Sequence, residues 1–273
     1  MRARLSAIAL TCAAAVSACA THEELQPTEQ EAALAEALQG RDLAPATAAE
    51  REAIKTQDLL TQAAFWAEAH ELNPGDREAA VELAAVLRTL SAAQRSAEVA
   101  RSALALYPDD ADLLGHYGMS LVALGRGPAA VEPLSRAVAS DETDWRLQNA
   151  LGVALEQAGR TGPARARFER ARALAPDRDA PVNNLALSHA LDGEPERAER
   201  LLREVVETGR AGPQTRQNLA LVVALQGRFA EAEEIALIDS TPEMAQANMD
   251  YVRSLMTNPR RWDALAEADL GSR

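Results

Sequence analysis

The stretch LGVALEQAGRTGPARARFERARALAP, Leu151–Pro176, decides the fold, because its landmark residues recur along the chain at one constant interval. Within this stretch, Gly159 belongs to an evenly spaced glycine series: Gly125, Gly159, Gly193 and Gly227. Ala164 belongs to an alanine series with the same spacing: Ala130, Ala164, Ala198 and Ala232. Pro74, Pro108 and Pro176 lie on a third grid with the same interval. One period shared by three residue classes predicts a protein built from repeated helix pairs.

Each residue class has a physical reason to recur within a helix pair. A glycine after the first helix can adopt the left-handed turn that reverses the chain. An alanine allows two helices to cross closely, and a proline ends the second helix. Prolines near the starts of second helices cost little, because the N–H group that they lack would be unpaired there: Pro128, Pro163 and Pro195. Pro133 falls well inside an expected second helix and predicts a kink or a late helix start there.

The composition agrees with an all-helical protein. Apolar residues make up 47% of the 273 residues but aromatic residues only 3%, so the chain is poor in the residues that favour strands. The formal net charge of −13 repels phosphate backbones and argues against nucleic acid as a partner.

The repeat resembles the tetratricopeptide repeat. The residues that carry the resemblance are Leu151, Gly152, Ala164, Phe168, Ala171 and Pro176, and a second unit matches at Tyr117, Gly118, Ala130, Leu134 and Ala137. The resemblance implies an all-α, right-handed superhelical solenoid with a concave groove lined by the first helix of each pair. We expect helix pairs over residues 77–108, 111–141, 145–175, 179–209 and 213–238, a leading helix that ends at Pro74, and a closing helix capped by Thr241.

The N-terminus carries the features of an export signal. Arg2 and Arg4 precede the apolar run Leu5–Val16, which is too short to span a bilayer. The run ends at Val16-Ser17-Ala18-Cys19, which resembles the bacterial lipobox; this resemblance implies acylation of Cys19 and cleavage just before it. The alternative is ordinary signal cleavage after Ala20.

These features divide the chain into four parts. Residues 1–18 are the expected lipoprotein signal peptide, residues 19–56 a lipidated tether, residues 57–258 a solenoid of about five repeats with flanking helices, and residues 259–273 a polar tail. Within the tether, Thr28 and Glu31 form a possible capping box, so a short helix over residues 28–39 and a mostly disordered spacer are both open.

The first helices offer two series of candidate groove residues. An apolar series recurs at the interval of the repeat in four of the five expected pairs, and its members either form a stripe in the groove or are partly buried between helices: Met119, Val153, Leu187 and Leu221. A carboxamide series beside it can hold a peptide backbone through paired donors and acceptors: Asn149, Asn183 and Gln217. Asn184 and Asn218 are expected to make structural hydrogen bonds, and Arg146 is the basic residue available to grip a carboxylate.

The sequence offers no support for catalysis. The four histidines are scattered without partners at metal-ligand spacing, and no glycine-rich phosphate loop or nucleophile–histidine–carboxylate arrangement occurs. We therefore expect no enzyme activity, no catalytic residue, no metal, no cofactor and no small-molecule substrate.

The C-terminal portion, NLALVVALQGRFAEAEEIALIDSTPEMAQANMDYVRSL, and the leading AAFWAEAHELNPGDREAA resemble the lipoproteins of the tight-adherence (Tad, or Flp) pilus machinery. The resemblance implies an outer-membrane lipoprotein that faces the periplasm and assists assembly of the pilus secretion channel in the manner of a pilotin. Its expected partners are the secretin or other pilus-assembly components. The alternative is a lipid-anchored adaptor that recruits cell-wall enzymes and has no connection with pili.

Overall fold

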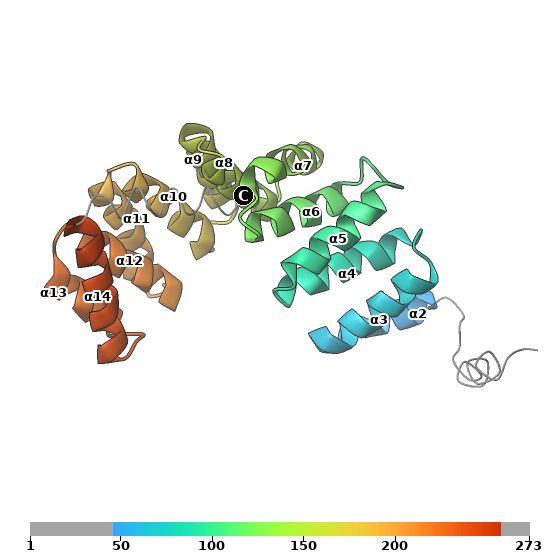
Figure 1. Ribbon diagram of the computed structural model, residues 1–273, viewed down its shortest axis with the longest axis horizontal. Coiled ribbons are helices and arrows are strands. Elements are labelled where there is room, and N and C mark those ends of the chain that lie inside the picture. Colours follow the sequence, from blue (N-terminus) through green and yellow to red (C-terminus); the bar gives the residue numbers. More distant parts are fainter. Residues whose placement is uncertain (1–45, 258–273) are drawn as a thin grey trace, which may run out of the picture. The chain divides into compact units, whose positions relative to one another are not determined.

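The computed structural model describes residues 46–257, and every regular element in that range is an α-helix. Thirteen helices follow one another there, and each contacts the next one in the chain (Figure 1). Across these residues, no helix has the length and apolar character needed to cross a lipid bilayer. The expected signal peptide, Cys19, the possible 28–39 helix and the 259–273 tail lie outside the described residues.

The helices pair as the period of the sequence predicts. α3, Leu59–Leu72, leads into five pairs and α14, Pro242–Thr257, follows them. The pairs are α4 with α5 (Arg77–Thr89, Ala93–Leu104), α6 with α7 (Ala111–Ala123, Gly127–Ser140), α8 with α9 (Trp145–Gln157, Thr161–Leu174), α10 with α11 (Asp179–Leu191, Pro195–Glu207), and α12 with α13 (Pro213–Leu225, Phe229–Ala236).

Aspartates at one position of the repeat cap three of the first helices. Asp76, Asp110 and Asp144 precede α4, α6 and α8, and each carboxylate accepts a hydrogen bond from a backbone N–H of the first turn. The residues at the equivalent positions before α10 and α12 are Arg178 and Gly212, and they make no such bond. The first three pairs therefore start with a stabilised N-terminus, and this regularity is a further sign of the repeat.

The glycine series adopts the expected left-handed backbone, with φ between 70° and 81° at Gly125, Gly159, Gly193 and Gly227. Ser91 lies one repeat before Gly125 and has φ 61°, the one non-glycine residue with positive φ among the described residues. The first pair thus makes the same turn with a residue that is less suited to it.

Replacing this residue, Ser91→Gly, is expected to raise the free energy of unfolding by about 0.5–1 kcal/mol, because glycine lacks the Cβ that crowds the backbone at positive φ. Urea unfolding measures the change. The matched control is Gly125→Ser, which should lower stability by a similar amount. Equal stability of the Ser91→Gly variant and the native chain would contradict the shared turn.

The alanine series is fully buried, since Ala130, Ala164, Ala198 and Ala232 all have 0% exposed surface. Ser96 occupies the equivalent place in the first pair, where its hydroxyl donates to the carbonyl of Ala84 at 2.8 Å. The close crossings inferred from the alanines are confirmed.

The glycines of the leucine-glycine and tyrosine-glycine pairs accommodate large side chains of the second helices. A Cβ on Gly152 would lie 2.4 Å from Cε1 of Phe168, and one on Gly118 would lie 2.4 Å from Cγ of Leu134. Such distances are shorter than van der Waals contact, so these positions require glycine as long as the partner is large.

Pro133 does not delay its helix, so the predicted late start is wrong. α7 begins at Gly127 and continues through Pro133, which is buried in the core. The prolines expected near helix starts are there: Pro128 in the first turn of α7, Pro163 in that of α9, and Pro195 as the first residue of α11.

The predicted tether contains a helix that the sequence pattern does not place: α2, Ala48–Ile54. Its Arg51 forms ion pairs with Asp76 and, at 2.9 Å, with Glu78, and the guanidinium lies 5.7 Å from the ring centroid of Trp66. α2 therefore packs against the start of the repeats, so the described helices begin before residue 57, where the solenoid is expected to start.

First helices contact one another, whereas second helices do not. The pairs α4–α6, α6–α8, α8–α10 and α10–α12 are in contact, and no contact joins α5, α7, α9, α11 and α13 to one another in the described chain. The first helices therefore lie on the inner side of the repeat stack. We call the solvent-facing side of α4, α6, α8, α10 and α12 the first-helix face.

Candidate protein-binding face

An apolar column runs along the first-helix face. Its members are Met119, Val153, Leu187 and Leu221, one on each of α6, α8, α10 and α12, and each is half-buried. Met119, Val153 and Leu221 pack against the core clusters beneath them while part of their surface stays accessible. The partial burial expected as the alternative is thus present, and the stripe formed by the accessible parts of these side chains stays a prediction.

The three residues of the predicted carboxamide series, Asn149, Asn183 and Gln217, have different surroundings in the structure. Asn149 on α8 and Asn184 on α10 are both half-buried, and the amide of Asn184 donates to the carbonyl oxygen of Asn149 at 2.9 Å. This bond joins two neighbouring first helices beside the apolar column. The amide of Asn149 and the carbonyl oxygen of Asn184 are left to serve a ligand, because each carboxamide has both a donor and an acceptor group.

Asn183 is not available to a ligand, which corrects the sequence prediction. It is 6% exposed, and its amide donates to the hydroxyl of Thr215 on α12 at 3.1 Å. Gln217 is exposed, as a ligand-binding residue should be. The structural hydrogen bonds expected for Asn184 and Asn218 are confirmed, since Asn218 accepts from Gln214 at 3.0 Å.

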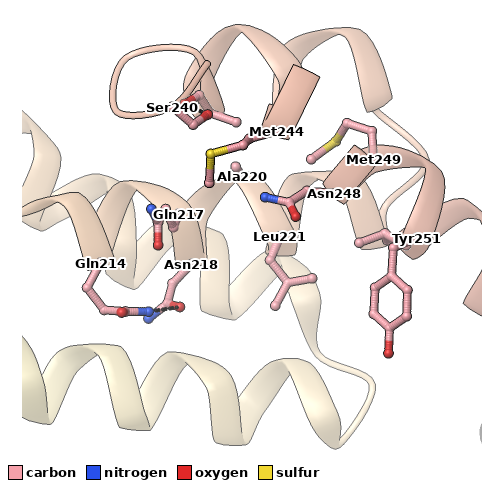
Figure 2. Close-up of a pocket in the computed structure, with 12 residues that line it drawn as sticks. Gln214, Gln217, Asn218, Ala220, Leu221, Ser240, Met244, Asn248, Met249 and Tyr251 are labelled. Carbon is pink, nitrogen blue, oxygen red and sulfur yellow. Dashed lines mark hydrogen bonds between the residues drawn. The ribbon is translucent and has the colours of Figure 1, made fainter. Parts of the chain in front are cut away.

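The face ends in a pocket of about 370 Å³ between α12 and α14 (Figure 2). Gln217 and Leu221 form the α12 side, and Met244, Asn248 and Tyr251 lie on the α14 side. Met244 and Tyr251 are 57% and 52% exposed, so the pocket is open to solvent, and the exposed carboxamides of Gln217 and Asn248 lie beside these apolar groups. Because Leu221 belongs to both, the pocket continues the apolar column.

Two arginines and a histidine lie on three consecutive first helices: Arg88 on α4, His116 on α6 and Arg146 on α8. Arg88, on α4, is half-buried and forms no ion pair with a described residue, and its Nε is buried without a hydrogen-bond partner. Burial and the nearby charge of Arg146, on α8, lower the pKa of Arg88. His116, on α6, has its pKa lowered to about 4 by burial and by the charge of Arg88, so it is neutral at pH 7. Arg146 is exposed, and its guanidinium lies 5.1 Å from the ring centroid of Trp145.

The sequence pattern pointed to Arg146 but not to Arg88 or His116. These two residues belong to different positions of the repeat and so form no series. Their juxtaposition depends on how consecutive first helices pack, which no single repeat encodes. Within the described residues no group of three histidine, cysteine or acidic side chains is arranged to hold a metal ion.

Solved structures show the same type of fold. PilW, described as a widely conserved type IV pilus biogenesis factor, matches over 76% of this chain and 93% of its own, with 22% identity and a TM-score of 0.59. MamA residues 41 to the end from Desulfovibrio magneticus RS-1 matches over 59% of this chain and 90% of its own, with 19% identity and a TM-score of 0.52. No protein-family model and no curated protein matches the chain. The likeness establishes an all-α, tetratricopeptide-like repeat solenoid.

Proposed function

We propose that the protein is a non-enzymatic, membrane-anchored scaffold that binds a protein segment on its first-helix face and so assists assembly of the Tad/Flp pilus secretion machinery. The observation that carries the proposal is the half-buried apolar column that leads into the α12–α14 pocket. Apolar side chains that pack on the core and still expose part of their surface to solvent make a rigid apolar surface. Such surfaces mark binding sites in soluble proteins.

The arrangement of the face fits an elongated ligand. The column crosses four consecutive first helices, so a single extended or helical segment can contact all of them. The Asn149–Asn184 pair lies beside the column and can fix the register of a peptide backbone by hydrogen bonds. A bound protein segment therefore uses the whole face, whereas a small molecule would use only the pocket.

Two considerations favour pilus assembly as the process. The C-terminal portion and the leading helix resemble Tad pilus lipoproteins in sequence. One structural neighbour, PilW, is itself described as a type IV pilus biogenesis factor. The proposed partner is the secretin or another component of the assembly machinery.

The proposed location is the periplasmic side of the outer membrane, with acylated Cys19 as the anchor. Several acyl chains hold a protein to a bilayer far more firmly than one, since each buried CH2 contributes about 0.8 kcal/mol. The segment between Cys19 and the start of α2 at Ala48 separates the anchor from the first described helix. The repeats would thus be held near the membrane but not at its surface.

Cys19→Ser is expected to release the protein from the membrane fraction or block its maturation, and to leave a deletion strain without surface pili, because serine cannot take the thioether-linked lipid. Palmitate labelling, membrane fractionation and electron microscopy of pili measure these effects, with the native gene as the rescue control. Equal membrane partitioning of the native and Cys19→Ser proteins would contradict the anchor. Normal piliation of the deletion strain itself would contradict the pilus function.

A further inference from the structure

One repeat differs from the others at two positions that contact each other. The third residue from the end of each first helix is buried, and in four pairs it is aliphatic: Leu87, Leu121, Leu155 and Val223. In α10 this residue is His189, which is 2% exposed. The residue just before the second helix of the same pair is Glu194, whereas the other pairs have Ala92, Arg126, Arg160 and Arg228. The α10–α11 pair thus has a histidine and an acidic residue where the other pairs have an aliphatic residue and a basic residue or alanine.

The histidine and the acidic residue form a hydrogen bond. Nδ1 of His189 lies 2.6 Å from Oε2 of Glu194. A carboxylate only accepts hydrogen bonds, so the imidazole carries a proton on Nδ1 and donates it to Glu194. Burial lowers the pKa of His189, and the ring is therefore neutral at pH 7. In this neutral ring Nε2 has no proton and can act only as a hydrogen-bond acceptor.

Nε2 of His189 is buried and makes no hydrogen bond with a described residue. An acceptor that is buried without a partner costs free energy, because it has given up hydrogen bonds with water. The aliphatic residues at the same position in the other four pairs avoid this cost. A histidine at this position indicates a binding role, in which a ligand supplies the missing donor.

His189 lines a pocket of about 400 Å³ that α9, α10 and α11 form together. The apolar part of its lining comes from four residues: Ala173, Pro176, Leu185 and Leu201. The charged part comes from Glu169, Arg172 and Arg197. Leu185 and His189 are one helical turn apart and so lie on one side of α10, whereas Leu187 of the apolar column lies on another. The pocket is therefore separate from the first-helix face.

We propose that this pocket binds a phenol, whose hydroxyl group donates a hydrogen bond to Nε2 of His189. The phenol is either the side chain of a tyrosine in a protein partner or a small aromatic molecule. The inference goes beyond the proposed function and does not depend on it, because the site lies on another side of the repeats.

The charges around His189 favour a neutral donor. Arg165 and Arg197 are close enough to lower the pKa of His189. They would repel a cationic donor such as an ammonium group. An anionic carboxylate has no proton to donate to Nε2. A hydroxyl group is neutral and small, so it satisfies the acceptor without adding a charge.

The rest of the lining favours an aromatic ring over an aliphatic alcohol. The apolar residues of the pocket would remove the ring from water, which is favourable for a ligand with one polar group. Arg197 is exposed, and its Nη1 lies 4.0 Å from Oε2 of Glu194, so it is only loosely paired. Its planar guanidinium can therefore stack on the face of the ring. Movement of this exposed side chain and of Glu169 would let the ligand reach the buried Nε2.

The test is nitrogen NMR of the full chain in detergent, with its histidines isotope-labelled. Two ligand pairs are compared: 4-methylphenol with toluene, which are the free side chains of tyrosine and phenylalanine, and a short peptide with one tyrosine against the same peptide with phenylalanine. The Nε2 signal of His189 should shift with the hydroxyl ligands only, and at least one of them should bind about ten-fold more tightly than its partner. The tighter hydroxyl ligand identifies the source of the phenol. Equal affinity within both pairs, or no binding, overturns the inference.

His189→Leu restores the residue type of the other pairs, so the fold should survive and the preference for the hydroxyl ligands should disappear. The Tm should rise by about 2–4 °C, because the unpaired acceptor is removed. The matched control, His70→Leu, changes a half-buried histidine of α3 outside the pocket and should keep the preference. Survival of the preference in His189→Leu, its loss in both variants, or a lower Tm of His189→Leu overturns the inference.

A second variant keeps the histidine and removes its acceptor. Glu194→Arg introduces the residue found before α7, α9 and α13. Because arginine only donates hydrogen bonds, it cannot hold the proton of the neutral ring on Nδ1, and the proton moves to Nε2. The Nε2 signal should become that of a protonated nitrogen, and the preference for the hydroxyl ligands should disappear. A preference that survives this change overturns the inference.

Discussion

Ala164→Trp is expected to lower the free energy of unfolding by about 3 kcal/mol and the Tm by about 6–12 °C, because the site has no room for a larger side chain. Ala164 is 0% exposed and belongs to a core cluster with Leu151, Ala154 and Phe168. The indole would have to displace these side chains or separate α8 from α9. Since each repeat is stable only against its neighbours, the loss would extend beyond one pair.

Thermal unfolding followed by circular dichroism measures the effect. The matched control is Ala166→Trp, which places the same side chain at an exposed position of the same helix and should change the Tm little. If the two variants unfold at the same temperature, Ala164 does not lie at a helix crossing and the repeat register is wrong.

The helix pairs could be predicted from the sequence because their determinants are local and repeated. A glycine after each first helix sets the turn, and a buried alanine at each crossing sets the approach of the two helices. Residues that depart from the glycine and alanine series still adopt the geometry of the repeat. Ser91 adopts the turn conformation of the glycines, and Ser96 takes the place of the buried alanine. Where Gly152 is required, the reason is the size of Phe168 opposite it.

The details of the binding face could not be predicted, because they depend on contacts between repeats. Asn149, Asn183 and Gln217 share one position in the repeat, yet they are half-buried, buried and exposed. Asn183 meets Thr215 on the next first helix, whereas Gln217 faces α14, which leaves a pocket. The period thus identifies equivalent positions but not their neighbours.

The helix α2 could have been predicted in part. It has seven residues, none of them buried, but Thr47 and Glu50 form a capping box, which is a helix-start signal in the sequence. Its stability comes from the ion pairs of Arg51 with Asp76 and Glu78, which belong to the first repeat. The start of α2 is thus marked locally, whereas its attachment to the first repeat depends on tertiary contacts that the sequence does not show.

Leu187→Glu/Leu221→Glu is expected to weaken partner binding by about 100-fold, or ~2.8 kcal/mol, because it places two charges in the half of the apolar column that joins the α12–α14 pocket. Both side chains are half-buried, so a charge there would remain partly solvated in the free protein but would be desolvated by a bound segment. The fold should survive with reduced stability. The Asn149→Ala variant should weaken binding less, since a single hydrogen bond contributes about 0.5–1.5 kcal/mol.

The most direct test of the account is co-purification of the secretin with the lipid-anchored protein from cells that carry this double variant. The matched control, Leu60→Glu/Leu106→Glu, changes two leucines that are 70% and 59% exposed and lie outside the first-helix face. With folding verified by circular dichroism, we expect the control to retain the secretin and the surface pili, and the Leu187→Glu/Leu221→Glu protein to lose both. A folded double variant that retains the secretin as well as the control does would contradict the claim that the first-helix face binds the partner.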